Sequence, residues 1–278
     1  MLSGNTREDG TVCGFGGCLY SRPADRTDTF RNLSPNLSAM FSLNANTSIF
    51  ASVSDGFRAP QGLELYRLQN GQLVSDLKSE NVTSGEVGVR SSTENRSADL
   101  VIFAMRKRDA VFRDTAGISI NGGRSRHRGI EASINWRFTS AWRLNANVSY
   151  ARHTYDFNAS GRGEIFVKGN DIDTAPRWLG SAEFLYEPSS RMRLGVQVTG
   201  IGSYFLEPGN QFKYSGHVIG NLRAGLQLTD TVSLVLRINN ATDERIADRA
   251  DYASRQYRYL PGRGREVFAE IRYLPFPL

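Results

Sequence analysis

Two stretches of the chain combine side chains that suit the binding of a flat, anionic ligand. Aromatic rings that could stack on such a ligand occur in the first stretch, residues 204–214: Tyr204, Phe205, Phe212 and Tyr214. The second stretch, residues 243–264, contains Tyr257 and Tyr259 together with these arginines: Arg245, Arg249, Arg255, Arg258 and Arg263. Guanidinium groups make short, charge-assisted hydrogen bonds to carboxylates and similar oxyanions. An ordinary charged surface is the alternative, because acidic residues of the same stretch neutralise part of this charge: Asp243, Glu244, Asp248 and Asp251.

The two cysteines form the short motif Cys13-Gly14-Phe15-Gly16-Gly17-Cys18. A disulfide-closed loop would suit an exported protein, because the periplasm and the cell surface are oxidising. The glycines between the cysteines allow the tight turn that such a bridge requires. A metal-binding pair is the alternative, but structural metal sites usually need four ligands and the sequence has no second pair. We therefore expect a Cys13–Cys18 disulfide and no metal site.

The sequence contains no recognisable catalytic motif. It has neither a Gly-x-Ser-x-Gly elbow nor a phosphate-binding glycine loop that ends in Lys-Ser or Lys-Thr. The histidines, His127, His153 and His217, are far apart, and each is alone in its predicted strand, so we interpret each as a polar structural residue. We expect a protein that is not an enzyme and has no cofactor. The net charge of +6 includes no basic run, so we expect no binding to nucleic acid.

The elements that must position these residues are β-strands. In residues 142–150 the apolar side chains of Trp142, Leu144, Ala146, Val148 and Tyr150 alternate with polar ones, and a period of two places them on opposite faces. Eleven segments of this kind are predicted: 29–43, 47–56, 80–91, 97–109, 127–138, 142–156, 175–186, 192–203, 215–228, 232–242 and 265–274. Aromatic residues are frequent at the ends of the apolar faces, as at membrane interfaces: Trp136, Phe138, Trp142, Tyr150, Trp178 and Tyr186.

The connections between these segments alternate strictly between short and long. Tight turns are predicted near 44–46, 91–96, 139–141, 187–191 and 229–231, and long connections at 57–79, 110–126, 157–174, 204–214 and 243–264. Outer-membrane β-barrels have tight periplasmic turns and long extracellular loops. No run of 18 apolar residues could form a transmembrane helix. The pattern therefore predicts an all-β fold, an antiparallel up-and-down transmembrane β-barrel meander with neighbours paired in sequence order.

Eleven strands is an odd number, whereas bacterial single-chain barrels have an even number and both termini in the periplasm. If the last strand ends in the periplasm, residues 1–28 fall outside the cell. The N-terminus also shows no signal peptide. We therefore expect an incomplete chain, in which residues 1–28 are an extracellular loop remnant and residues 29–278 are the C-terminal half of a larger barrel.

Three motifs give the chain a family resemblance. The first is Gly56-Phe57-Arg58-Ala59-Pro60, followed by Glu64-Leu65-Tyr66. The second is Glu86-x-Gly88-x-Arg90, and the third is Gly264-Arg265 at the start of the last segment. Their order and spacing resemble the TonB-dependent outer-membrane receptors from about residue 30 to the C-terminus. Glu86 and Arg90 share a strand face, as do Arg106 and Arg108, and we expect these charges to face a polar lumen or a plug.

The resemblance implies a plugged 22-stranded barrel in the outer membrane of a Gram-negative bacterium. Members of this family import scarce ligands, such as ferric siderophores, cobalamin or saccharides, with energy from the TonB complex. Here the arginines favour a ferric siderophore or another anionic complex, bound by the 204–214 and 243–264 loops. The implied partners are this small-molecule ligand, membrane lipid and lipopolysaccharide, the barrel-assembly machinery, and TonB through a plug domain that the chain lacks. The alternative is a truncated or passive structural barrel, porin-like or adhesin-like, without energised transport.

Overall fold

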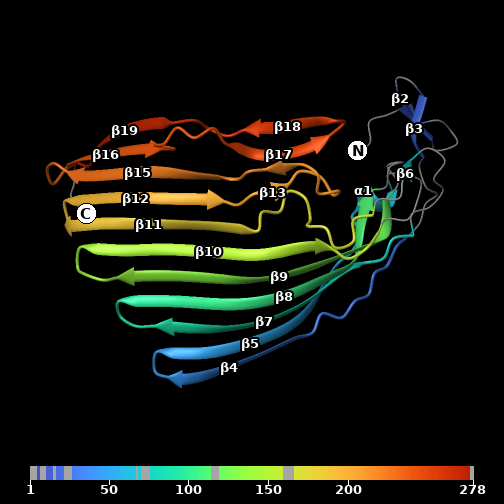
Figure 1. Cartoon of the computed structure of the whole chain (residues 1–278), viewed down its shortest axis with the longest axis horizontal. Helices are drawn as coiled ribbons and strands as arrows, with labels where there is room; N and C mark the ends of the chain where they lie inside the picture. Colours follow the sequence, from blue (N-terminus) through green and yellow to red (C-terminus); the bar gives the residue numbers. More distant parts are fainter. Residues whose placement is uncertain are drawn as a thin grey trace.

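The computed structural model describes residues 5–6, 11–14, 17–21, 27–66, 68–69, 76–113, 119–158 and 166–275, with side chains for 27–66, 76–111, 121–158 and 166–275. An eleven-stranded antiparallel sheet dominates the structure (Figure 1). Its strands are β4 (Asn36–Asn44), β5 (Thr47–Arg58), β7 (Glu80–Ser92), β8 (Arg96–Arg113), β9 (Ser119–Arg137), β10 (Trp142–Tyr155), β11 (Trp178–Ser189), β12 (Met192–Ile201), β15 (His217–Gln227), β16 (Val232–Asn239) and β19 (Glu266–Tyr273). Across the sheet they follow chain order, from β4 at one end to β19 at the other. The predicted meander is confirmed.

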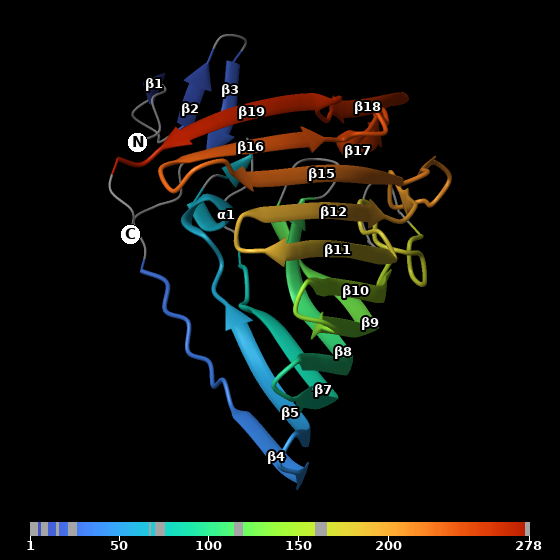
Figure 2. The same ribbon diagram turned by 90° about the vertical axis from the view of Figure 1, so that its left-hand side faces the viewer.

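The sheet curves across its width, so that its strands form an open arc (Figure 2). All tight turns lie at one end of the strands, the short-turn end, and the long connections lie at the other, the long-loop end (Figure 1). Strands β4 and β19 form the two edges, and no described strand pairs with the outer side of either. No helix in the described part of the chain is long and apolar enough to cross a membrane.

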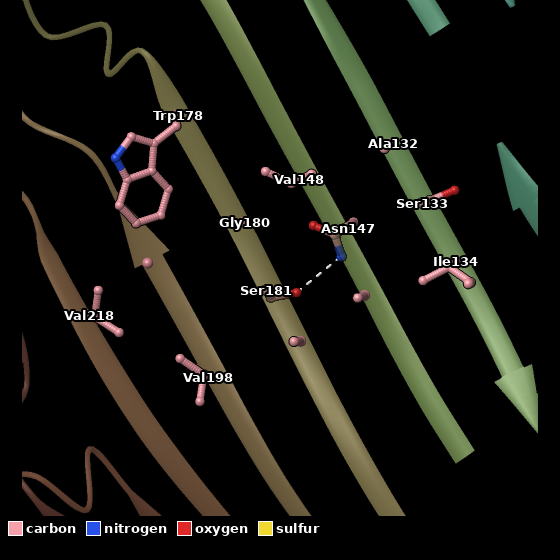
Figure 3. Close-up of a pocket in the computed structure, with 13 residues that line it drawn as sticks. Ala132, Ser133, Ile134, Asn147, Val148, Trp178, Gly180, Ser181, Val198 and Val218 are labelled. Atoms are coloured by element: carbon pink, nitrogen blue, oxygen red, sulfur yellow. Dashed lines mark hydrogen bonds between the residues drawn. The ribbon is translucent and has the colours of Figure 1, made fainter. Parts of the chain in front are cut away.

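The two faces of the sheet differ as the alternation predicts. Tyr150 lies opposite Ile130 on β9 and Trp178 on β11, whereas Asn147, on the other face, donates a 3.0 Å hydrogen bond from Nδ2 to Ser181 Oγ (Figure 3). Many apolar-face side chains are exposed, which fits a surface covered by lipid rather than water. Trp142 and Tyr150 border this face on β10. The eight residue steps from Trp142 to Tyr150 span about 26 Å along the strand, close to the height of a lipid-facing barrel band.

Several predicted segments have different bounds in the structure. The first strand begins at Asn36 rather than residue 29, because Pro35 lacks the N–H needed to continue the ladder. The carbonyl of Pro35 still accepts a 3.0 Å hydrogen bond from Asp55 N–H, which keeps the preceding segment beside β5. Strands β8 and β9 extend into the predicted 110–126 loop, with Arg113 paired to Ser119 across two register shifts.

Smaller elements gather at the long-loop end (Figure 1). They are α1 (Gly62–Tyr66), the hairpin of β13 (Tyr204–Phe205) and β14 (Lys213–Tyr214), the hairpin of β17 (Ala247–Ala253) and β18 (Gln256–Pro261), and a sheet of β1 (Asn5–Thr6), β2 (Thr11–Gly14), β3 (Gly17–Ser21) and β6 (Leu68–Gln69). The 204–214 and 243–264 loops are therefore not irregular, because each forms a short hairpin.

The cysteine motif lies in the small sheet. Strands β2 and β3 form a hairpin in which the backbone of Cys13 pairs with that of Cys18, and β3 also pairs with β6 in the connection that follows α1. Paired Cα atoms in antiparallel strands are about 4.5–5.5 Å apart, within the range that a disulfide spans. The two side chains lie outside the described residues, so the disulfide stays a prediction. The assignment of residues 1–28 as a loop remnant is also still a prediction.

Exported protein should contain the Cys13–Cys18 disulfide. Alkylation without reductant, followed by mass spectrometry of the peptide that contains both cysteines, should find neither thiol modified. After reduction, both should be alkylated. Two alkylated thiols in the unreduced sample would contradict the prediction.

Candidate functional site

Glu80 is the centre of an ion-pair network at the long-loop end of β5, β7 and β8. One carboxylate oxygen, Oε2, lies 2.9 Å from Arg58 Nε and 2.9 Å from Lys107 Nζ. The other, Oε1, accepts a 2.7 Å hydrogen bond from Val111 N–H. Arg58 also contacts Glu64 of α1 at 3.1 Å, and Glu80 itself is only 3% exposed. The network therefore fixes α1 to the ends of three strands.

Other motif residues have structural contacts too. A Cβ on Gly88 would lie 2.5 Å from the Phe50 ring, so only glycine lets this ring cross β7. The Arg90 guanidinium lies above the same ring, 5.7 Å from its centroid, and pairs with Asp99 on β8. Glu86 accepts a 2.9 Å hydrogen bond from Ser52. The residues of the Glu86-x-Gly88-x-Arg90 motif therefore make structural contacts with neighbouring strands on the polar face of the sheet.

The remaining motif residues join loops to strands. Pro60 and Leu65 are buried near α1, and Tyr66 donates a 2.8 Å hydrogen bond to Asp28. Near the last strand, Arg265 N–H donates to Asp243 Oδ1 at 3.1 Å. The other motif residues lie beside these: Gly56 and Phe57 at the end of β5, Ala59 directly after it, and Gly264 shortly before β19.

The aromatic residues predicted in the 204–214 loop form a packed cluster. Tyr204 is 7% exposed, and its hydroxyl accepts a 3.2 Å hydrogen bond from Ala250 N–H on β17. Tyr214 accepts in the same way from Ala247 N–H at 3.1 Å. Phe212 stacks on Tyr252, with ring centroids 3.9 Å apart. Burial raises the pKa of the Tyr204 hydroxyl above its ordinary value. These three residues hold the two hairpins together, which a count of aromatic residues could not reveal.

Phe205 points to a different neighbour. Its ring lies 4.5 Å from Lys213 Nζ, which makes a cation–π contact across the β13–β14 hairpin.

The β17–β18 hairpin presents the more exposed predicted residues. Tyr257 and Tyr259 are 51% and 52% exposed, and their rings are parallel, with centroids 6.2 Å apart. Arg258 pairs with Asp251 at 2.5 Å, and Arg263 pairs with Glu266 at 3.1 Å. Arg255 occupies the hairpin turn with a φ of 62°. Among the described side chains, no carboxylate lies within ion-pair distance of Arg255.

The two predicted loops meet through their rings. Phe212 contacts Tyr257 edge to face, with centroids 5.6 Å apart. The structure therefore brings the 204–214 and 243–264 loops into one surface, on which Arg255, Tyr257 and Tyr259 are exposed together with the paired Arg258.

A second ion-pair cluster, which was not predicted from the sequence, surrounds Asp171. Arg152 on β10 and Arg177 before β11 reach its two carboxylate oxygens at 3.0 and 2.6 Å. Asn210 hydrogen-bonds both the backbone N–H and the carbonyl of Asp171, at 2.8 and 2.9 Å, which links this loop to the 204–214 loop. Burial opposes ionisation, but the Arg177 and Arg152 hydrogen bonds outweigh it and hold the pKa of Asp171 below its usual range.

Replacing Asp171 by asparagine should loosen the 166–177 and 204–214 loops at neutral pH, by about 1–3 kcal/mol, because two guanidinium groups lose a charged acceptor. Folding lowers the pKa of the Asp171 carboxylate. The ionised carboxylate therefore stabilises the loops fully above pH 3.8, its pKa in the unfolded chain, and this stabilisation is lost as the pH falls through the lower pKa of the folded protein. Hydrogen exchange of an intact receptor should show faster exchange in the variant at pH 7. Loop stabilities that still differ at strongly acidic pH would show that the carboxylate charge is not the cause.

Two sequence-based expectations about charged and polar residues are wrong. His127 and His153 are not isolated, because the β9–β10 register places them opposite each other, with Nδ1 atoms 2.7 Å apart. His217, at the start of β15, hydrogen-bonds the Tyr214 hydroxyl at 2.8 Å. Arg106 and Arg108 do not face the polar side of the sheet. They share a face with Ile102, because β8 keeps its alternation through these residues.

The comparisons with known proteins agree with this geometry. A family model described as "TonB dependent receptor-like, beta-barrel" matches residues 5–241. The chain belongs to the TonB-dependent receptor family. TonB-dependent receptors are outer-membrane proteins of Gram-negative bacteria, so the apolar face is the lipid-facing wall and the long-loop end is extracellular.

Three relatives illustrate the match. The ferric-pyoverdine M114 receptor PbuA of Pseudomonas sp. (strain M114) is 25% identical over 222 residues, which cover 77% of this chain and 26% of that receptor. The ferric yersiniabactin uptake receptor FyuA of Yersinia pestis is 18% identical, with a TM-score of 0.72, over 86% of this chain and 36% of FyuA. The siderophore receptor PiuA of Acinetobacter baumannii is 19% identical, also with a TM-score of 0.72, over 85% of this chain and 35% of PiuA. The chain thus spans only about a third of the solved receptors, whose likeness shows the fold.

Proposed function

We propose that this chain supplies barrel wall and extracellular loops to a receptor that imports a scarce anionic ligand, a ferric siderophore or a similar complex, with energy from TonB. Membership of the TonB-dependent receptor family supports the transport class. The relative PbuA, named as a ferric-pyoverdine receptor, supports iron chelates as the ligand class. A passive porin-like or adhesin-like barrel is less favoured, because this family couples its barrels to TonB.

The observation that carries the ligand class is the exposed surface of the β17–β18 hairpin. Two parallel tyrosine rings lie on this hairpin at the extracellular end of the sheet, and Arg255 lies in its turn. Ferric chelates carry anionic oxygens and often flat ligand groups, so guanidinium hydrogen bonds and ring contacts suit them. The packed cluster of Tyr204, Phe212 and Tyr214 would hold this surface in place before the ligand arrives, which reduces the entropy lost on binding.

The other proposed partners act at different levels of the membrane. The TonB complex would act on a plug domain and not on the strands described above. The barrel-assembly machinery would fold the strands into the outer membrane, and lipid and lipopolysaccharide would cover the apolar face.

Uptake of radioactive iron tests the proposal. An intact receptor that contains this chain is expressed in cells without other siderophore receptors and supplied with a panel of ferric chelates. We expect uptake of at least one anionic chelate, and we expect it to stop when TonB is deleted. Equal uptake with and without TonB would favour the passive alternative. Uptake of no anionic chelate from a broad panel would overturn the ligand class.

A further inference from the structure

The polar face of the sheet carries a pair of histidines near its extracellular end. The β9–β10 register places His127 directly opposite His153, and their Nδ1 atoms are 2.7 Å apart. Both rings are half-buried. His153 shares the polar face with Asn147, which precedes it on β10 by an even number of residues. Sequence alone predicts no metal site here, because only the register brings the two rings together.

The two facing Nδ1 atoms have few competitors. Among the described side chains, only the Ser125 hydroxyl and the partner ring hydrogen-bond to these histidines. Ser125 Oγ lies 2.8 Å from Nε2 of His127, on the far side of that ring. Next on the same face of the two strands, Gly129 lies opposite Ala151, and neither has a side chain long enough to reach the pair. The two Nδ1 atoms are therefore available to a ligand that separates them.

The carboxylates on either side of the pair are already engaged. Glu80 pairs with Lys107, which lies opposite Ser125, at 2.9 Å. Asp171, whose backbone bridges to that of Thr154, pairs with Arg152 at 3.0 Å. In the described part of the chain, no group of three or more histidines, cysteines or carboxylates is placed to hold a metal ion. A metal ion at the pair would thus take two protein ligands and keep its other positions open to water or to the donor atoms of a chelate.

We propose that His127 and His153 bind a divalent transition-metal cation with tetrahedral coordination, of which Zn²⁺ is the type, through their Nδ1 atoms. Two neutral imidazoles at this distance share one proton between these atoms, and the metal ion replaces it. That proton moves to the Nε2 atom of its own ring, so both rings stay neutral and no proton is lost. Histidine ligands usually hydrogen-bond through their other ring nitrogen, as His127 does to Ser125.

The spacing of the rings fits a tetrahedral metal ion. Zn–N bonds of about 2.0–2.1 Å at a tetrahedral angle place two nitrogen ligands about 3.3 Å apart and their ring centroids about 5.2 Å apart. The centroids of the two histidine rings are 5.0 Å apart. The rings therefore need only tilt where they stand, whereas a square-planar site would bring the centroids to about 4.5 Å. The site lies on β9 and β10, away from the β17–β18 hairpin, and does not depend on the ligand class proposed above.

Isothermal titration of an intact, untagged receptor with zinc chloride tests the site. We expect His127→Asn and His153→Asn each to bind one zinc equivalent fewer than the unmodified receptor. The matched control is His217→Asn, which removes the histidine that hydrogen-bonds to Tyr214 and should keep the full number. The heat-dependent gel mobility of folded barrels shows that each variant is assembled. Unchanged zinc stoichiometry in either pair variant would overturn the proposal, and this result is independent of whether the receptor takes up ferric chelates.

X-ray absorption tests the coordination without any substitution. The unmodified receptor loaded with one zinc equivalent should show two imidazole ligands at about 2.0–2.1 Å, and a shell of oxygen atoms alone would overturn the proposal.

Ser125 is proposed as a positioning residue for His127. Ser125→Ala should weaken zinc binding about 10–100-fold, and Ser125→Thr, which keeps the hydroxyl, should restore it. Unchanged affinity in Ser125→Ala would overturn this role.

Discussion

Replacing Glu80 by alanine should destabilise the extracellular end of β5, β7 and β8 by about 2–3 kcal/mol, since two cations and a backbone N–H lose a buried acceptor. Glu80 receives Arg58, Lys107 and Val111 N–H at 2.7–2.9 Å. Arg58 and Lys107 are 38% and 35% exposed, so water can replace part of the lost interaction. We therefore expect less than the full cost of an isolated buried charge. Hydrogen exchange of an intact receptor should accelerate in α1 and in residues 107–111.

The matched control for this prediction is Glu86→Ala on the same strand. Glu86 is exposed on the polar face and accepts one described side-chain hydrogen bond, from Ser52. Its loss should cost less than about 1 kcal/mol and leave α1 unaffected. Equal exchange in the two variants would mean that the Glu80 network does not hold this end of the barrel together.

The sheet could be predicted because its causes are local. Alternation along residues 142–150 fixes which side chains face lipid, and tight turns near 139–141 and 187–191 fix which strands are neighbours. The structure confirms both in the β9–β10 and β10–β11 registers. The errors at the strand ends also have local causes, such as the missing N–H of Pro35.

The loop surface could not be predicted in the same way, because its contacts join residues far apart in the chain. Tyr204 reads as an exposed ligand-stacking ring in sequence, but its partner Ala250 is 46 residues away. His127 and His153 look isolated until the hairpin register pairs them. In the sequence, nothing distinguishes Asp171 from other loop carboxylates. Its partners lie in other segments, Arg152 near the end of β10 and Arg177 directly before β11, and only the fold brings them to it. Residue type alone identified candidate ligand-binding side chains. Only the packing shows which of them are buried in structural contacts and which are accessible to a ligand.

The packing also distinguishes loop arginines that have carboxylate partners from one that has none among the described side chains. Arg258 and Arg263 already pair with Asp251 and Glu266, so a ligand must compete with these carboxylates. Arg255 has no such partner among the described side chains, and it lies in the turn of the same hairpin as Tyr257 and Tyr259. We therefore expect Arg255 to provide the largest share of any anion binding by this hairpin.

Replacing Arg255, Arg258 and Arg263 together by glutamine in an intact receptor should weaken the binding of an anionic ferric chelate at low salt by at least about tenfold. One charge-assisted hydrogen bond of about 1.5–3 kcal/mol accounts for this change. Arg255→Gln alone should reproduce most of it. Added salt screens exposed charges, with a Debye length of about 10 Å at 0.1 M, so affinity should fall with salt in the unmodified receptor and fall less in the triple variant.

The control for a change of net charge alone is Arg96→Gln/Arg137→Gln/Arg191→Gln. It also removes three positive charges, but at the short-turn end of the sheet. Dissociation constants measured at low and high salt by tryptophan fluorescence quenching should match those of the unmodified receptor. Barrel assembly should be normal in both triple variants, because all six arginines lie beyond the lipid-facing band. If the loop variant binds the chelate as tightly as the control at every salt concentration, these arginines face only solvent or lipopolysaccharide. The ligand surface must then be built from other loops of the barrel.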